Sequence, residues 1–183
     1  MTGELTPDDG RRLLQVARRA IEARLRARAL ESEPAAGALA EPRGAFVTLR
    51  RRADGELRGC IGYTEPTFPL VETVARAAAA AATTDDRFEP VALADLPRLT
   101  LEVSVLGPLQ PIAPADVQVG THGLVIRFGG QAGLLLPQVA VEHGWDARTL
   151  LEQTCRKAGL LPDTWRQPGA TLLAFTAAVF CED

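Results

Sequence analysis

The chain has 183 residues, of which 46% are hydrophobic and 23% are charged, and its formal net charge is −3. This composition is typical of a globular protein that buries a sizeable core, and it excludes a disordered chain. The small negative charge excludes the broad basic field that nucleic-acid-binding domains use.

The cysteine content indicates a reducing compartment. Cys60, Cys155 and Cys181 are odd in number and widely spaced, which argues against a disulfide framework. With only two histidines the sequence shows no zinc-ligand pattern, and its glycines form no nucleotide-binding motif. We find no secretory leader and no apolar run long enough to cross a membrane. We therefore expect a cytoplasmic protein, with no metal and no cofactor.

The first predicted element is a helix that begins at Thr6, where a capping hydroxyl precedes a proline and two acids. Two strands, 45–52 and 56–62, flank the tight-turn dipeptide Asp54-Gly55 and predict a β-hairpin. A helix with a small apolar side is expected over 70–84, where it can pack closely on a sheet.

The second half repeats this order of elements. We predict strands at 99–106, 124–128 and 132–136, helices at 138–143 and 147–158, and a final strand at 171–180. A hairpin followed by a helix thus occurs at 45–84 and again at 124–158. Tight hairpins interleaved with helices predict an α+β fold with mainly antiparallel sheets rather than a doubly wound parallel sheet.

One predicted strand, the stretch LRGCIGY at residues 57–63, combines a cysteine, an arginine and two glycines. Because side chains alternate between the two faces of a strand, Arg58, Cys60 and Gly62 are predicted to share one face. A guanidinium roughly 6–7 Å from the thiol would favour the thiolate. Gly59 and Gly62 are candidate ligand-binding positions, since glycines in strands mark bulges or close approaches. The alternative is that Cys60 is a small buried hydrophobic residue.

Two more candidates follow the helix predicted over 70–84. The acids Asp85 and Asp86 and the guanidinium of Arg87 either line a cleft beside Cys60, with Asp86 moving protons, or pair within a turn. Gln138 lies at a predicted strand-to-helix junction, where polar side chains commonly meet a ligand. Its alternative role is a helix cap.

Two histidines are weaker candidates for a catalytic base. His122 is predicted in a turn between glycines, and His143 ends a short helix before Gly144. Either imidazole could activate a cysteine nucleophile across a cleft. An exposed histidine in a turn or at a helix end is the more common arrangement.

Several motifs in chain order carry a family resemblance: LRGCIGY (57–63), DRFEP (86–90), LEVSVL (101–106), GLLLPQVA (133–140), GWD (144–146), CRKAGL (155–160) and the closing segment 175–182. Together they resemble the AMMECR domain family, called AmmeMemoRadiSam system protein A in prokaryotes. The resemblance begins near Leu13. One departure is Asp85-Asp86, where the family usually has Asp-Pro. The absence of the proline makes that turn less rigid.

The resemblance implies one AMMECR-like domain over 1–183, built from two packed and intertwined α+β subdomains. The first covers about 40–106 and carries the LRGCIGY motif, and the second covers about 107–183. The prokaryotic family name implies Memo-like and radical S-adenosylmethionine proteins as partners in a modification pathway.

Two functions are compatible with these residues. In the first, the protein is a cysteine-dependent enzyme: Cys60 is the nucleophile, Arg58 binds an anionic group, and Asp86 or a histidine moves protons. In the second, it is a non-catalytic adaptor domain that binds a small molecule or peptide in the same cleft. We expect neither a nucleic acid nor a membrane as partner.

Overall fold

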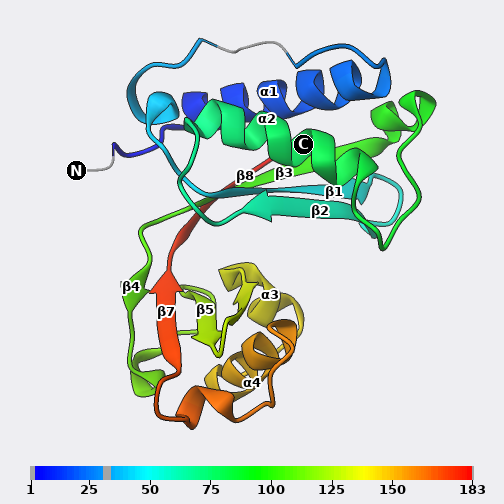
Figure 1. Cartoon of the computed structure of the whole chain (residues 1–183). Helices are drawn as coiled ribbons and strands as arrows, with labels where there is room; N and C mark the ends of the chain where they lie inside the picture. The colour runs from blue at the N-terminus through cyan, green and yellow to red at the C-terminus, as the bar shows by residue number, and fades with distance from the viewer. Residues whose placement is uncertain (1–2, 31–33, 183) are drawn as a thin grey trace. The chain divides into compact units, whose positions relative to one another are not determined.

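A computed structural model describes residues 3–30 and 34–182 (Figure 1). Its helices and strands are α1 (Pro7–Leu25), β1 (Ala45–Arg51), β2 (Leu57–Tyr63), α2 (Leu70–Thr83), β3 (Leu99–Leu106), β4 (Gln110–Pro111), β5 (Gly123–Phe128), β6 (Gln131–Leu135), α3 (Pro137–Glu142), α4 (Ala147–Lys157), β7 (Thr171–Phe175) and β8 (Ala177–Cys181). Short 3-10 helices are η1 (Gly37–Ala40), η2 (Leu93–Arg98), η3 (Pro114–Asp116) and η4 (Thr164–Arg166). The predicted α+β class with antiparallel hairpins followed by helices is confirmed.

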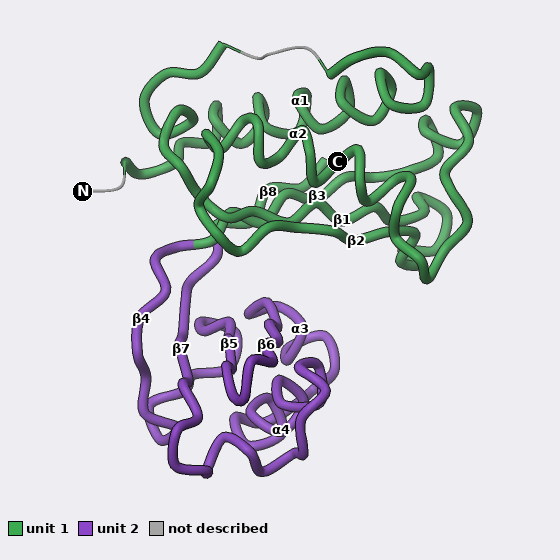
Figure 2. The backbone as a smooth tube through the Cα atoms, in the orientation of Figure 1, with its two compact units in different colours: residues 1–106, 178–183 green, residues 107–177 purple. Residues whose placement is uncertain are grey.

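The chain forms two compact units, which Figure 2 shows in different colours. Unit 1 comprises residues 1–106 and 178–183, and unit 2 comprises residues 107–177. The single strand expected over 171–180 is two strands in different sheets, because β7 pairs with β5 and β4 while β8 pairs with β3. The end of the chain therefore belongs to unit 1.

Unit 1 contains a four-stranded sheet in the order β2-β1-β3-β8. Helices α1 and α2 contact each other and together cover one face of this sheet (Figure 1). Apolar residues from both layers form the buried core, which includes Leu13, Ile21, Val47, Leu49, Leu70, Val74, Leu101 and Val103. Burying these side chains supplies most of the free energy that holds the layers together.

The two ends of α1 are capped by the local sequence. The Thr6 hydroxyl accepts a hydrogen bond from the Asp9 amide at 3.2 Å, and the Asp9 carboxylate accepts one from the Thr6 amide at 2.9 Å. This capping box confirms the predicted start of the helix. At the other end the Arg28 amide donates to the Ala23 carbonyl at 2.8 Å, and Ala27 adopts a φ of 53°. This is a Schellman turn with alanine where glycine is favoured.

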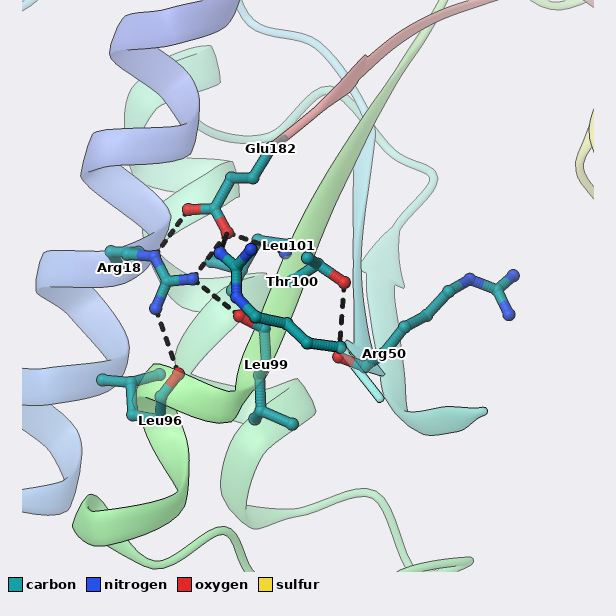
Figure 3. A network of polar contacts seen from close by, with 8 residues as sticks. Arg18, Arg50, Leu96, Leu99, Thr100, Leu101 and Glu182 are labelled. Carbon is teal, nitrogen blue, oxygen red and sulfur yellow. Dashed lines mark hydrogen bonds and ion pairs between the residues drawn. The ribbon is translucent and has the colours of Figure 1, made fainter. Parts of the chain in front are cut away.

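A polar network fastens the end of the chain to α1 and β3 (Figure 3). The Glu182 carboxylate accepts hydrogen bonds from Arg18 Nε at 2.5 Å, from Arg18 Nη2 at 2.6 Å and from the Leu101 amide at 3.0 Å. Arg18 also donates to the carbonyls of Leu96 and Leu99. Because the Glu182 side chain is only 16% exposed, its charge depends on these donors for compensation.

Unit 2 contains a second four-stranded sheet, in the order β4-β7-β5-β6, against which α4 packs. Its core includes Leu124, Ile126, Leu150, Leu151 and Cys155. The Asp146 carboxylate accepts a hydrogen bond from the Thr149 amide at 2.7 Å and caps the first turn of α4. Across residues 3–30 and 34–182, no helix is both long and apolar enough to cross a membrane.

Candidate functional site

Cys60 lies on β2, which forms one edge of the unit 1 sheet. It stands opposite Thr48 of β1, and the backbone groups of Cys60 point away from β1. Such a non-hydrogen-bonded pair brings the two side chains close together. The Thr48 hydroxyl donates a hydrogen bond to Cys60 Sγ at 3.4 Å. The thiol therefore lies on the sheet face opposite the helices, half-buried beside a hydroxyl group.

Asp85 and Arg87 cover the outward backbone groups of Cys60. After α2 ends, the Asp85 carboxylate accepts a hydrogen bond from the Cys60 amide at 2.8 Å. Arg87 binds the same carboxylate with two nitrogens, Nε at 2.9 Å and Nη2 at 2.7 Å. Arg87 Nη2 also donates to the Cys60 carbonyl at 3.3 Å. The two side chains thus take the place of a neighbouring strand at this one residue of the sheet edge.

The electrostatics of this cluster fix Asp85 as a carboxylate. Its side chain is 3% exposed, whereas that of Arg87 is 48% exposed. The hydrogen bonds from Arg87 dominate, and with the Cys60 amide they outweigh burial and lower the pKa of Asp85 to about 2. The Arg87 guanidinium is correspondingly held in its charged form, because the Asp85 carboxylate raises its pKa.

The same surroundings disfavour the Cys60 thiolate. Burial is the largest influence and raises the pKa of the thiol, and the charges of Asp85 and Glu102 act in the same direction. The Thr48 hydroxyl and the Arg87 charge oppose this shift, but the pKa of Cys60 remains above its ordinary value. Cys60 is therefore a neutral thiol at physiological pH.

A polar row continues from Cys60 across the sheet. Thr48 stands opposite Glu102 of β3, and the Cys181 thiol of β8 donates to the Glu102 carboxylate at 3.6 Å. The Ser104 hydroxyl also donates to Glu102, at 3.5 Å. Within residues 3–30 and 34–182, no cluster of three or more histidine, cysteine or acidic side chains is arranged to hold a metal ion.

Arg58 occupies a β-bulge that the sequence pattern did not indicate. Gly59 pairs with Leu49 and Leu57 pairs with Arg50, so Arg58 is the extra residue of β2. A bulge interrupts strict alternation, so alternation alone no longer predicts that Arg58 and Cys60 share a face. The cation that lowers the pKa of the thiol is Arg87 rather than Arg58.

The two glycines of the motif admit close neighbours. A Cβ atom on Gly59 would lie 2.2 Å from the Ala81 carbonyl oxygen of α2, so only glycine lets this helix approach the strand. A Cβ atom on Gly62 would lie 2.3 Å from the Phe46 ring. Both missing side chains are thus accounted for by contacts within unit 1.

The remaining candidates are Asp86 in unit 1 and three residues of unit 2, namely His122, His143 and Gln138. Asp86 is exposed in the turn beside Asp85, and only its charge reaches Arg87. In unit 2, His122 Nδ1 accepts a hydrogen bond from the Gln118 amide at 3.1 Å. His143 stacks on the Trp145 ring at 4.7 Å.

Gln138 also belongs to unit 2, where it lies in the first turn of α3. Sequence reasoning did not select Thr48 or Glu102, and it considered Asp85 only together with Asp86 as an acid beside the cleft. Asp85 carried a signal in the Asp85-Asp86 pair, whereas the other two become visible only once the strand register is known.

Comparison with known proteins places this arrangement in a family. The AMMECR1 family model matches residues 14–180. The chain belongs to the AMMECR1 family. It is 44% identical to protein MK0488 of Methanopyrus kandleri, covering 100% of this chain and 93% of that protein. It is 47% identical to a protein of Aeropyrum pernix, over 98% of this chain and 81% of the relative.

A solved structure of the uncharacterized protein PH0010 from Pyrococcus horikoshii has the same AMMECR1-like fold, with a TM-score of 0.90. The two chains are 43% identical, and the match covers 95% of this chain and 91% of the other. The predicted membership of the AMMECR family is thus confirmed.

Proposed function

We propose that this AMMECR1-family protein is a non-catalytic binding domain, and that the β2 edge around Cys60 receives its ligand. The observation that carries this proposal is the engagement of Asp85 and Arg87. Both side chains are bound to each other and to the backbone of Cys60. They hold the edge in place, and neither is poised to exchange a proton with the thiol.

A cysteine nucleophile needs a base or a cation that favours the thiolate. Asp85, with a pKa of about 2, is too weak a base at neutral pH, and its negative charge raises the pKa of Cys60. The charge of Arg87 is offset by the carboxylate that it binds. Both histidines of the chain belong to unit 2, so unit 1 has no imidazole of its own.

A cysteine-dependent enzyme is the second candidate function. It is favoured by the Thr48 hydroxyl, which donates to Cys60 Sγ at 3.4 Å, and by Arg87, since both lower the pKa of the thiol. Memo-like and radical S-adenosylmethionine proteins are the partners that the family name implies. Under the binding proposal, such a partner supplies the bound segment.

The test is alkylation of the native protein by iodoacetamide across pH, with each cysteine resolved by mass spectrometry. We expect Cys60 to react appreciably only above the ordinary thiol pKa of about 8.5. Cys181 is exposed and reports the reagent's access to the surface, whereas Cys155 is fully buried and reports unfolding. Rapid alkylation of Cys60 near pH 6, with Cys155 still protected, would overturn the proposal in favour of the enzyme.

A further inference from the structure

A cavity lies two residues beyond Cys60, at the end of β2. Its volume is about 240 Å³, and it is lined by Gly62, Tyr63, Thr64, Glu65, Thr67 and Phe68. The Phe68 ring is held by the Arg76 guanidinium, which lies 4.3 Å from the ring centroid. The space is smaller than a typical drug-sized site and suits one apolar side chain.

The backbone beside this cavity is an open sheet edge. In an antiparallel ladder, residues two apart direct their N–H and C=O groups to the same side. Cys60 directs these groups outward, to Asp85 and Arg87, so Gly62 directs its own outward too. In the part of the chain that the structure describes, no hydrogen bond reaches the two groups of Gly62. The outward backbone groups of Cys60 are therefore bound within the protein, whereas those of Gly62, the next outward-facing residue of β2, are open to a partner.

We infer that this open edge binds an extended peptide, which pairs with the N–H and C=O of Gly62 and inserts an apolar side chain into the cavity. The inference deepens the proposed binding function and rests on it. A donor and an acceptor on one glycine match the two polar groups of a peptide residue, as in strand addition to other sheets. The Asp85–Arg87 pair limits the added strand, because it occupies the next position along the edge.

The cavity sets the preference for the side chain. The surface that lines the cavity is mainly apolar, so a leucine side chain would exchange water for apolar contacts there. The peptide's main-chain hydrogen bonds would give affinity that is independent of sequence, and the cavity would give selectivity.

The test is an NMR titration of the full chain, labelled with ¹⁵N, using the peptide N-acetyl-Ala-Leu-Ala-methylamide. We expect amide shifts centred on residues 60–68. The same peptide with every amide N-methylated, and the analogue with glycine in place of leucine, should each bind about tenfold more weakly. Shifts centred elsewhere, none at millimolar peptide, or equal binding of the N-methylated peptide would overturn the inference.

Variants locate the site without disturbing the strand. Gly62 itself is unsuitable, because a Cβ atom would collide with Phe46. Thr67→Trp, at an exposed position in the cavity wall, should weaken binding about tenfold. Thr121→Trp, at an exposed turn of unit 2, should leave binding unchanged. Equal binding to both variants would contradict the assignment.

Alkylation of Cys60 and the peptide titration, taken together, separate the two proposals. If the titration fails while alkylation shows an unactivated Cys60, only the peptide inference is lost. Rapid alkylation of Cys60 near pH 6 would instead reject the non-catalytic function, whatever the peptide result.

Discussion

Replacing Asp85 by asparagine tests whether the Asp85–Arg87 pair stabilises the β2 edge. Asparagine keeps the shape of aspartate but removes its negative charge and one of its two acceptor oxygens. Both oxygens of Asp85 accept hydrogen bonds, from Arg87 and from the Cys60 amide. The pKa of Asp85 falls from 3.8 to about 2 on folding, which corresponds to about 2.5 kcal/mol. Because Arg87 is 48% exposed, solvent screening reduces this to about 1–2 kcal/mol.

The sign of the pH dependence follows from the lowered pKa. A carboxyl group whose pKa is lower in the folded state stabilises the fold fully above its unfolded pKa of 3.8, and loses this contribution as the pH falls towards 2. Because the NH2 group of asparagine would face a donor that the carboxylate now satisfies, we expect Asp85→Asn to lower the unfolding free energy by about 2 kcal/mol near pH 7. Near pH 2, where Asp85 is itself substantially protonated, the difference should fall by about half or more.

Urea unfolding at several pH values measures the global difference, and hydrogen exchange of the Cys60 amide localises it. Asp86→Asn is the matched control, since it removes the same charge from the exposed neighbouring position, and it should change stability by less than about 0.5 kcal/mol. A difference for Asp85→Asn that is below about 0.5 kcal/mol near pH 7, or that does not depend on pH, would refute the reasoning.

Two further substitutions test the C-terminal end of α1 and the polar network around Glu182. Ala27→Gly should raise the unfolding free energy by about 0.5–1 kcal/mol, because Ala27 has a φ of 53°, which glycine adopts without strain. The control Ala23→Gly, within α1, should lower the unfolding free energy by about as much. A change of the same sign for both variants in thermal unfolding would contradict this prediction. Glu182→Gln should cost about 1–3 kcal/mol in urea unfolding, because the carboxylate that Arg18 binds is 16% exposed. Glu56→Gln removes a 69% exposed partner of an arginine and should cost less than about 0.5 kcal/mol; equal losses would show that burial does not strengthen the Arg18 pair.

Local sequence signals predicted much of the fold. The start of α1 at Thr6 was predicted correctly, because the capping side chain bonds to an amide three residues away. The turn at Asp54-Gly55 was also predicted, since the chain there needs the positive φ of 72° that Gly55 adopts. The α+β class followed from the alternation of such hairpins and helices.

Strand pairing decided what the sequence could not. The row from Cys60 through Thr48 to Glu102 exists because β3, which follows α2 in the chain, pairs with the β1–β2 hairpin in a fixed register. The bulge at Arg58 and the division of 171–180 between two sheets also depend on pairing partners.

By itself, the sequence determined the family and the fold class, because these depend on motifs and local periodicity. Only the tertiary structure decided that Asp85 and Arg87, rather than Asp86 and Arg58, surround the thiol's backbone. The physical reason is that burial and the charges of distant segments set the pKa of Cys60, and those neighbours are chosen by folding rather than by sequence spacing.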